Sequence, residues 1–241
     1  MRKIFFHIGA RKNSQGVKNK NIKLINGKPL IQWSIEQAKK IKRNSKIIVS
    51  SDSKTILNLS KKLKVDFLIS RPKNLSSSKT SKIYVWKHSV NYMFKKKLMD
   101  ENDIFIDLDC TCPIRDINDI KLMIKKFNKF NKLRKKFDGI ISITEARKNP
   151  YFNLVEKNKN NHLELSKKLK KNIVRRQDCP NVFEHVASIY VLKPLFILKK
   201  NFLMHGKLYG HLIKNFTGLD IDNKFDFKIV KYILGLKNAK Y

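Results

Sequence analysis

The stretch from Ile4 to Asn21, IFFHIGARKNSQGVKNKN, decides the fold. Its first five residues are mostly apolar, which is typical of a strand buried on both faces of a sheet. The rest is polar, with two glycines and several cations, and this composition suits a polyphosphate held by backbone N–H groups and positive charge. The loop has neither the P-loop spacing GxxxxGK[ST] nor the dinucleotide spacing GxGxxG. Its spacing leaves two interpretations open, a phosphate-binding loop and a solvated basic loop.

Strands and helices alternate along the rest of the chain. Apolar runs predict strands at 46–50, 65–69, 103–108, 139–143 and 186–192. Helical spacing predicts helices that begin at Pro29 or span 55–63, 80–97, 118–130 and 224–236. This alternation indicates an α/β fold with three layers, a mostly parallel sheet with helices on both faces. Ligands bind at the carboxyl ends of the strands in such folds, so the loops at 9–21, 51–53 and 109–115 are expected to meet at one edge.

Residues 150–185 break this alternation. They mix asparagine and lysine with isolated apolar residues, and Pro150 and Pro180 interrupt any long element. We expect a small excursion from the sheet within a single domain that spans residues 1–241.

The formal net charge is +35, from 54 Lys and Arg against 19 Asp and Glu. A polyanion partner such as RNA, DNA or an anionic lipid is one explanation. Compositional bias is the other, because only nine basic residues are arginine and the lysines are spread along the whole chain. The even spread favours bias, so we expect no nucleic-acid partner.

The apolar runs are too short for a membrane protein. The run at 103–108 is far below the roughly 20 residues that a membrane-spanning helix needs, and the N-terminal stretch has no signal-peptide pattern. We expect a cytoplasmic protein without membrane association. Cys110, Cys112 and Cys179 have neither a disulfide framework nor a zinc-site spacing, which is typical of small buried residues.

Short motifs distributed over nearly the whole chain carry a family resemblance. In order they are IGARKNSQGVKNKNI at 8–22, NGKPL at 26–30, SD at 51–52, RPKNL at 71–75, DLDCTCPIR at 107–115, NPYFN at 149–153, RRQ at 175–177, and DID at 220–222 with Asp226. This series resembles the acylneuraminate cytidylyltransferases, which make CMP-sialic acid and related compounds such as CMP-legionaminic acid. The resemblance implies a nucleotide-diphospho-sugar transferase-like fold and a homodimer formed through the excursion at 150–185.

The resemblance also implies roles for individual residues. Arg11 and Lys20 are implied to hold the triphosphate and, with Asp220 and Asp222, to be catalytic. The implied nucleotide site consists of Ala10, Arg11, Ser14, Lys20, Asn21, Arg71 and Asp109. The implied sugar site consists of Asp109, Arg115, Arg176, Gln177 and Tyr190.

Asp220 and Asp222 are candidate ligands of Mg²⁺. Side chains at positions i and i+2 of an extended strand point to one face, and Mg²⁺ prefers carboxylate and phosphate oxygens. Residue types alone leave a second role open, because Asp222 is also placed to cap a helix that begins near Lys224. The resemblance favours metal binding by both aspartates and gives Asp226 an orienting or capping role.

Four positions depart from the family pattern. Gly9 replaces a proline, Gln15 a loop lysine, Cys112 a serine and Val186 a common asparagine. Gln15 removes a cation from the implied phosphate site, and Val186 changes the implied sugar contacts. The histidines have no metal-ligand spacing. His7 is expected to be a hydrogen-bonded core residue, and His185 is a candidate to face the sugar.

Together these observations predict an enzyme that joins CMP from CTP to a nonulosonic acid of the sialic-acid type, releases pyrophosphate and uses Mg²⁺. Two alternatives stay open. One is a basic nucleic-acid-binding protein on a degenerate cytidylyltransferase fold, and the other is a cytidylyltransferase for 3-deoxy-manno-octulosonate. The sequence identifies neither the particular nonulosonic acid nor a general base.

Overall fold

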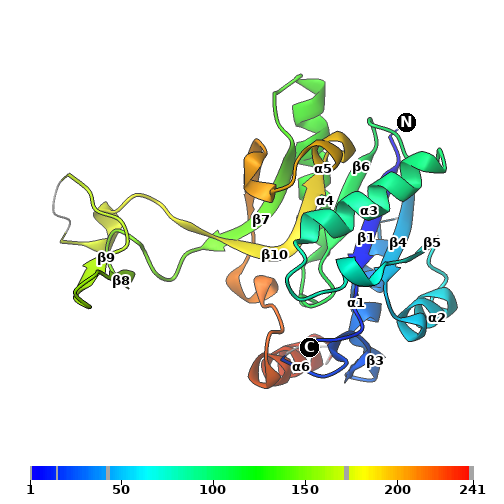
Figure 1. The fold of residues 1–241 in the computed structure, drawn as a ribbon, viewed down its shortest axis with the longest axis horizontal. Coiled ribbons are helices and arrows are strands. Elements are labelled where there is room, and N and C mark those ends of the chain that lie inside the picture. The colour runs from blue at the N-terminus through cyan, green and yellow to red at the C-terminus, as the bar shows by residue number, and fades with distance from the viewer. Residues whose placement is uncertain (1, 15, 42–43, 171–173, 239–241) are drawn as a thin grey trace.

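A seven-stranded sheet forms the centre of the computed structural model, which describes residues 2–14, 16–41, 44–170 and 174–238 (Figure 1). Its strands are β1 (Ile4–Gly9), β4 (Ser45–Ser51), β5 (Phe67–Ser70), β6 (Ile104–Leu108), β7 (Gly139–Glu145), β10 (Phe183–Leu192) and β11 (Leu208–Leu212). They are ordered β11-β7-β10-β6-β1-β4-β5. Only β10 runs antiparallel to its neighbours, so the mostly parallel sheet is confirmed.

Helices cover both faces of this sheet. Helices α1 (Leu30–Lys39), α2 (Lys54–Lys62) and α4 (Ile117–Lys132) share one apolar core with the strands. Helices α3 (Lys82–Lys95) and α5 (Pro194–Lys199) share the other. Strand β1 supplies Phe6 and Ile8 to the first core and Phe5 to the second, as the two-residue period of a strand requires. The predicted three-layer α/β arrangement is therefore confirmed.

A third apolar cluster lies at the edge where the parallel strands end. Helix α6 (Lys224–Asn238) packs there with the short hairpin of β2 (Leu24–Ile25) and β3 (Lys28–Pro29). Val17, from the loop after β1, and Ile221, from the segment before α6, are buried in the same cluster. The two segments are thus held together although they are about 200 residues apart in the chain.

The second half of the sheet differs from the sequence-based expectation. Strand β10 begins at Phe183 rather than 186, and its pairing with β7 shifts register between His185 and Tyr190. Strand β11, which the sequence did not predict, pairs with β7 in parallel. It is short and partly exposed, so it lacks the apolar run by which a buried strand is recognised.

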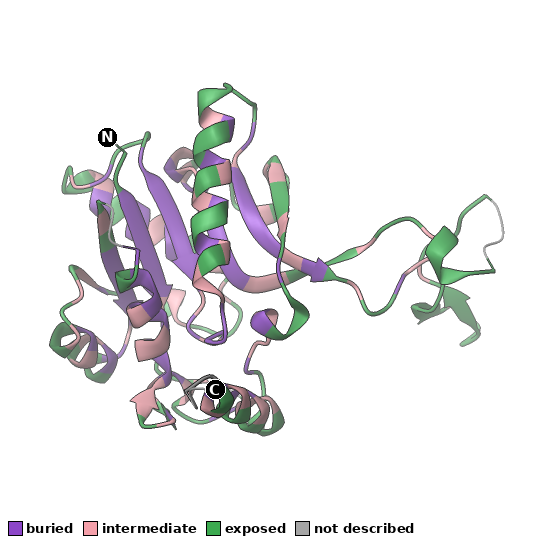
Figure 2. Cartoon of the chain, turned by 180° about the vertical axis from the view of Figure 1, so that it is seen from behind, coloured by how far each residue is buried: buried purple, intermediate pink, exposed green. Residues whose placement is uncertain are grey.

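The excursion after β7 is an arm that projects away from the sheet (Figure 1). It carries a small hairpin of β8 (Val155–Lys157) and β9 (Leu163–Leu165), followed by a turn of 3₁₀ helix at Arg176–Asp178. Figure 2 shows the contrast in burial, since the strands of the body are buried and the arm is almost entirely exposed.

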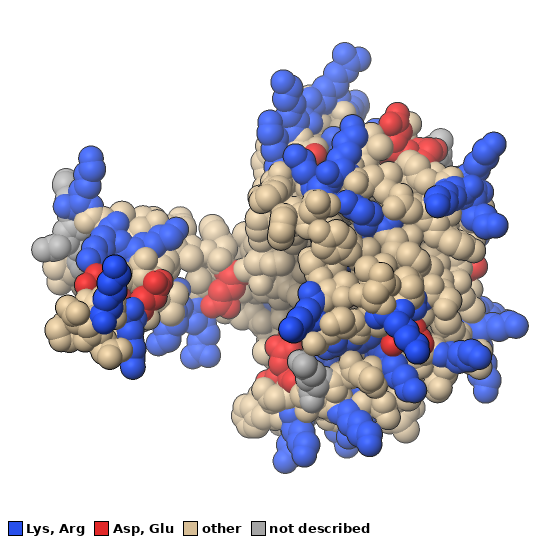
Figure 3. Space-filling view, viewed as in Figure 1, with Lys and Arg blue, Asp and Glu red and all other residues tan. Residues whose placement is uncertain are grey.

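Basic side chains are spread over both the body and the arm on the face shown in Figure 3, with acidic side chains between them. In that view they do not gather over one element, which agrees with a compositional origin of the charge. In the described part of the chain, no helix has the length and apolar character needed to cross a membrane.

Candidate active site at the strand ends

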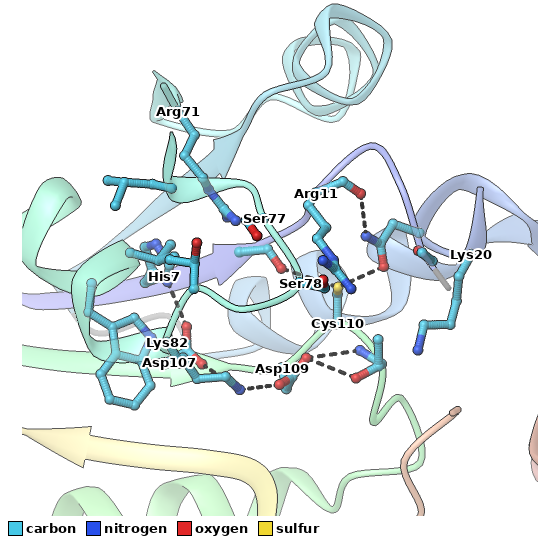
Figure 4. A pocket seen from close by; sticks show the side chains of 18 of the residues that line it. His7, Arg11, Lys20, Arg71, Ser77, Ser78, Lys82, Asp107, Asp109 and Cys110 are labelled. Atoms are coloured by element: carbon cyan, nitrogen blue, oxygen red, sulfur yellow. Dashed lines mark hydrogen bonds and ion pairs between the residues drawn. The ribbon is translucent and has the colours of Figure 1, made fainter. Parts of the chain in front are cut away.

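A cavity of about 380 Å³ lies at the carboxyl ends of β1 and β6 (Figure 4). Strand β1 lies between β4 and β6 in the sheet, so the order in which strands are added reverses direction at β1. A crevice at such a reversal is the usual ligand site of an open α/β sheet. Its walls are the loop after β1, the residues after β5, the start of α3, the residues after β6, and Asp222.

Hydrogen bonds fix the shape of the loop after β1. The Ala10 N–H donates to the Ser50 carbonyl over 3.0 Å, and the Lys12 N–H donates to the Asp52 carboxylate over 2.8 Å. Asn21, which is 5% exposed, donates its amide to the Arg11 carbonyl over 2.9 Å. Ala10 is buried and does not line the cavity, whereas Arg11, Ser14, Lys20 and Asn21 do.

The same loop lies in contact with the segment that contains the two candidate metal ligands. A Cβ added to Gly16 would be 1.7 Å from the Asp222 carbonyl oxygen, so only glycine fits there. The Lys20 ammonium donates to the Ile221 carbonyl. These contacts hold the cationic loop and Asp222 side by side, and both line the same cavity.

Arg71 closes the cavity at the end of β5. The side chain is almost fully buried, and its Nη2 donates to the Ser50 carbonyl over 2.7 Å. Burial lowers the pKa of Arg71, and the nearby Asp52 carboxylate opposes this shift. The guanidinium therefore stays charged in a fixed position next to Gly9.

A buried charged network forms the floor of the cavity (Figure 4). His7 Nδ1 lies 2.6 Å from Asp107 Oδ1, and His7 Nε2 lies 3.1 Å from Ser89 Oγ. The expectation that His7 is a hydrogen-bonded core residue is confirmed. The Lys82 ammonium forms an ion pair with Asp109 and lies 3.7 Å from Asp107 Oδ2.

Lys82 controls the ionisation of this floor. Burial alone would raise the pKa of Asp109, but the adjacent Lys82 ammonium outweighs burial and lowers it. Burial likewise opposes the charged form of Lys82, yet Asp109, Tyr190 and Asp107 outweigh it and raise the pKa of Lys82 well above its usual range. The two groups are therefore an ammonium and a carboxylate at neutral pH.

The sequence analysis missed Lys82 and the hydroxyl-rich loop before α3. Ser77, Ser78 and Thr80 of that loop line the cavity together with Lys82. The signal was the polar stretch SSSKTS at 76–81, which separates a predicted strand from a predicted helix and therefore lies at the ligand edge. Lys82 itself gave no signal, because lysines are abundant throughout the chain.

The Asp220–Asp222 segment is extended but is not a strand, which corrects the expectation that these residues lie on one. A single backbone bond, from the Ile221 N–H to the Thr111 carbonyl over 3.0 Å, attaches it to the loop after β6. Ile221 is fully buried in the core beneath α6. Beside it, Asp222 is exposed and Asp220 is half-buried.

The helix cap at the start of α6 belongs to Asn223 rather than Asp222. Asn223 Oδ1 accepts from the Asp226 N–H over 3.0 Å, and Asp226 Oδ2 accepts from the Asn223 N–H over 3.0 Å. This reciprocal pair has the geometry of a capping box. Asp226 therefore caps, as expected, and the carboxylate of Asp222 is not the capping group.

Asp220 and Asp222 fit a hard cation. Asp220 Oδ1 is buried and has no hydrogen-bond partner among the described residues, and Asp222 lines the cavity. Burial and the nearby Asp109 raise the pKa of Asp220. The described residues contain no group of three or more His, Cys, Asp or Glu that forms a metal cluster. Two carboxylates completed by phosphate oxygens and water match the usual coordination of Mg²⁺.

Two expected sugar contacts lie at or beneath the floor. Tyr190 is 2% exposed; its ring centroid lies 4.9 Å from that of Trp86 and 5.5 Å from that of His185. Arg115 is buried below the cavity, where it donates to Gln37 Oε1 over 2.6 Å and to the Asp109 carbonyl. Its described hydrogen bonds therefore hold the floor in place and do not face the cavity.

Arg176 and Gln177 lie elsewhere, exposed on the arm. Arg176 donates to the Ala146 carbonyl over 2.8 Å and lines a separate hollow of about 330 Å³ at the base of the arm. Within one chain, the structure does not bring either residue to the cavity that contains Asp109.

The departures from the family pattern have different surroundings. The buried Cys112 thiol donates to the Thr217 carbonyl over 3.4 Å, so the cysteine occupies a fixed structural position. The Val186 carbonyl accepts from Ser142 Oγ over 2.9 Å where β10 shifts register. Gln15 lies outside the described residues.

The family model described as cytidylyltransferase matches residues 6–233. The chain belongs to the cytidylyltransferase family. This cytidylyltransferase is 36% identical over 241 residues to "Post-translational flagellin modification protein B" of Campylobacter coli. The matched residues are 100% of this chain and 98% of that protein. It is 34% identical over 239 residues to the CMP-N,N'-diacetyllegionaminic acid synthase of Campylobacter jejuni. The matched residues are 99% of this chain and 97% of that protein.

More distant similarities agree with this assignment. The N-acylneuraminate cytidylyltransferase of Escherichia coli is 27% identical over 246 residues, which are 99% of this chain and 54% of that protein. The solved structure of CMP:2-keto-3-deoxy-manno-octonic acid synthetase with CTP superposes with a TM-score of 0.68 at 16% identity, over 98% of this chain and 99% of that one. At this identity the superposition shows the shared fold.

Proposed function

We propose that this cytidylyltransferase transfers CMP from CTP to a nonulosonic acid of the sialic-acid type and releases pyrophosphate. The observation that carries the proposal is one cavity lined by Arg11 and Lys20, from the loop after β1, and by Asp222. That arrangement brings cations for a triphosphate together with a carboxylate for its counter-cation. The relatives named above support the choice of acceptor.

The nucleotide side is formed by the loop after β1 and the end of β5. Arg11 and Lys20 bind the triphosphate and stabilise the negative charge of the departing pyrophosphate, with Ser14 and Asn21 beside them. Arg71, fixed by Ser50, lies toward the base. Asp220 and Asp222 would hold Mg²⁺, which when bound neutralises phosphate charge and polarises the α-phosphate.

The acceptor side is formed by the floor. There the anomeric hydroxyl of the acid attacks the α-phosphorus; the new O–P bond forms as the bond to the β-phosphate oxygen breaks, and the hydroxyl proton passes to solvent. Asp109 orients the acid, and Tyr190 supports the floor from beneath it. Catalysis comes mainly from this positioning and from charge stabilisation. The acid is of the legionaminic type, a choice supported by the high identity and near-complete coverage of the Campylobacter jejuni relative.

The functional form is a homodimer in which the arms meet. On one face of the β8–β9 hairpin, Val155 and Leu165 are cross-strand partners and Leu163 is their neighbour. All three are exposed in the single chain, at 50%, 38% and 66% respectively. A two-stranded hairpin is not stable alone, and a second copy that covers this face supplies the missing burial. Arg176 and Gln177 then reach the partner's cavity.

The proposed substrates also bear on location and partners. CTP is an intracellular nucleotide, so the reaction belongs in the cytoplasm. On the face shown in Figure 3 the lysine and arginine side chains are scattered, and this supports a general attraction of polyphosphates over a dedicated nucleic-acid surface on that face.

Pyrophosphate release in the presence of CTP, Mg²⁺ and a panel of nonulosonic acids tests the proposal directly. We expect release with a legionaminic-type acid and much less with 3-deoxy-manno-octulosonate. CTP at 100 times its Kd should stabilise the fold by about 2.7 kcal/mol, because it binds only the folded state. Equal thermal shifts with CTP, ATP and GTP, or no release with any acid, would contradict the proposal.

A further inference from the structure

Carboxylates are concentrated in and beside the cavity. Asp107, Asp109 and Asp222 line it, and Asp220 is close enough to Asp109 for the two charges to interact. The chain has only 19 acidic residues against 54 basic ones, so this local excess of negative charge is unusual. The proposed acceptor is itself an anion, and it has to enter the same place.

The other cations that line the cavity belong to the loop after β1 and the end of β5. Lys20 donates to the Ile221 carbonyl, and Arg71 is bound to Ser50. Arg11 belongs to the loop after β1 and faces the cavity from the nucleotide side (Figure 4). Among the described lining residues, this leaves Lys82 as the cation on the floor.

Lys82 is placed for contact with a ligand. It lies in the first turn of α3, and its ammonium is 4.9 Å from the centroid of the Tyr190 ring and paired with Asp109. Its side chain is nonetheless 36% exposed and lines the cavity. An ammonium has three N–H donors. Lys82 lines the same cavity as its partners Asp107 and Asp109, so a ligand held there lies within reach of this side chain.

We propose that Lys82 is an acceptor-binding residue whose ammonium receives the carboxylate of the sugar acid while it neutralises Asp109 and Asp107. This inference rests on the proposed function and adds a residue to the sugar side that neither the motifs nor the relatives' names assign. Without Lys82, an anionic acceptor would face a floor of like charge, and its binding would be disfavoured by Coulomb repulsion in a partly desolvated site.

The test is a comparison of kinetic constants for Lys82→Met and Lys82→Arg. Methionine keeps most of the length of the side chain and removes the charge, whereas arginine keeps the charge. We expect Lys82→Met to raise KM for the acid by about 10- to 100-fold, equivalent to about 1.4–2.8 kcal/mol, and to leave KM for CTP within about twofold. Lys82→Arg should recover part of the loss. Unchanged KM for the acid, or an equal rise in both KM values, would overturn the proposal.

A neutral acceptor distinguishes direct binding from positioning of Asp109. With the carboxamide of the same acid as acceptor, wild type and Lys82→Met should have similar KM values, because the charge that Lys82 binds is absent. An equal penalty for the acid and its carboxamide would show that Lys82 acts only by holding Asp109, and the proposal would be wrong.

Controls separate this inference from folding and from the proposed function. Lys87→Met removes a lysine from the same helix whose ammonium contacts Asn201 instead of the cavity, and it should leave both KM values unchanged. Thermal stabilisation by CTP reports whether Lys82→Met is folded. If wild type releases no pyrophosphate with any acid, the proposed function fails; if wild type is active and Lys82→Met behaves like wild type, only the role of Lys82 fails.

Discussion

The cavity at the strand ends and the arm differ in how far one chain completes them. Around the cavity, residues such as Asn21, Arg71 and Asp107 are nearly buried and bonded to specific partners. On the arm, apolar side chains such as Leu163 and Val174 are exposed, at 66% and 86%. The difference teaches that one chain completes the cavity, whereas the apolar side chains of the described part of the arm stay uncovered in one chain and are suited to contact a second copy.

This contrast also explains where the expected sugar residues lie. Asp109 directly follows β6 and Tyr190 is on β10, whereas Arg176 and Gln177 are exposed on the arm. If the arms of two chains cross, residues separated within one chain come together between chains. The predictions below test each side of this comparison.

The largest expected effect is on assembly through the arm. Replacing both Leu163 and Leu165 by Glu places two charges on the apolar face of the hairpin. Burying each leucine at an interface is worth about 1.5–3 kcal/mol, so the double variant should weaken dimerisation by at least about 3 kcal/mol, or more than 10²-fold in Kd. Sedimentation at micromolar concentration should then change from dimer to monomer.

The matched control is Lys159→Glu, which puts the same charge in the exposed turn of the hairpin and should stay dimeric. Wild type that sediments as a monomer would contradict the dimer. A monomeric double variant that keeps full turnover would show that Arg176 and Gln177 do not complete the partner's site.

The next effect concerns the carboxylates in the cavity. Asp222→Asn removes a charged oxygen ligand from the site proposed for Mg²⁺, and losing one such electrostatic contact typically lowers kcat about 10²- to 10³-fold. Because Asn223 and Asp226 form the helix cap, Asp222→Ala should also fold normally. Both variants should unfold within about 0.5 kcal/mol of wild type, as surface changes usually do.

The readout is kcat measured against Mg²⁺ concentration, together with Mg²⁺ binding in the presence of CTP. Asp226→Ala is the complementary variant, since it should lower stability by about 1 kcal/mol through loss of the cap. It keeps both candidate ligand carboxylates but removes the acceptor of the Asp222 N–H, so it should change the Mg²⁺ dependence much less than Asp222→Asn does. If kcat depends on Mg²⁺ concentration in the same way for wild type and Asp222→Asn, Asp222 is not a metal ligand.

The sequence predicted the first half of the molecule better than the second. Up to residue 145 the strands are apolar runs and the helices are amphipathic, so the period of the pattern reveals both the element and its face. Strand β10 belongs partly to the exposed arm, and β11 is short and half-exposed, so neither has a full apolar pattern. Tertiary pairing, which the local pattern does not encode, determines them.

The sequence motifs predicted those cavity residues that belong to a motif. The loop after β1, Arg71, Asp109 and Asp222 all line the cavity. The role of Arg115 differs from the expectation because its motif cannot reveal that the guanidinium points beneath the floor. Lys82 was missed because one lysine among many carries no pattern, and only the folded structure shows that it meets Asp109.

The smallest expected effects are those of alanine substitutions at two glycines, Gly16 in the loop after β1 and Gly235 in α6. At Gly16 an added methyl group would overlap the backbone carbonyl of Asp222, which cannot rotate away. At Gly235, inside α6, the nearest atom to an added Cβ is Asn26 Nδ2 at 3.6 Å, an ordinary contact. The same substitution is therefore expected to act in opposite directions at the two positions.

Gly16→Ala should destabilise the fold by about 1–3 kcal/mol, as inserted atoms in a packed site usually do. It should also lower turnover, by up to about 10²-fold for a 1 Å displacement of the loop, because Arg11 and Lys20 move relative to Asp222. Gly235→Ala should raise stability by about 0.5–1 kcal/mol through better helix propensity and leave turnover unchanged. Urea unfolding and pyrophosphate release measure both variants. If Gly16→Ala were as stable and active as wild type, the loop would not contact Asp222, and the two walls of the cavity would be independent of each other.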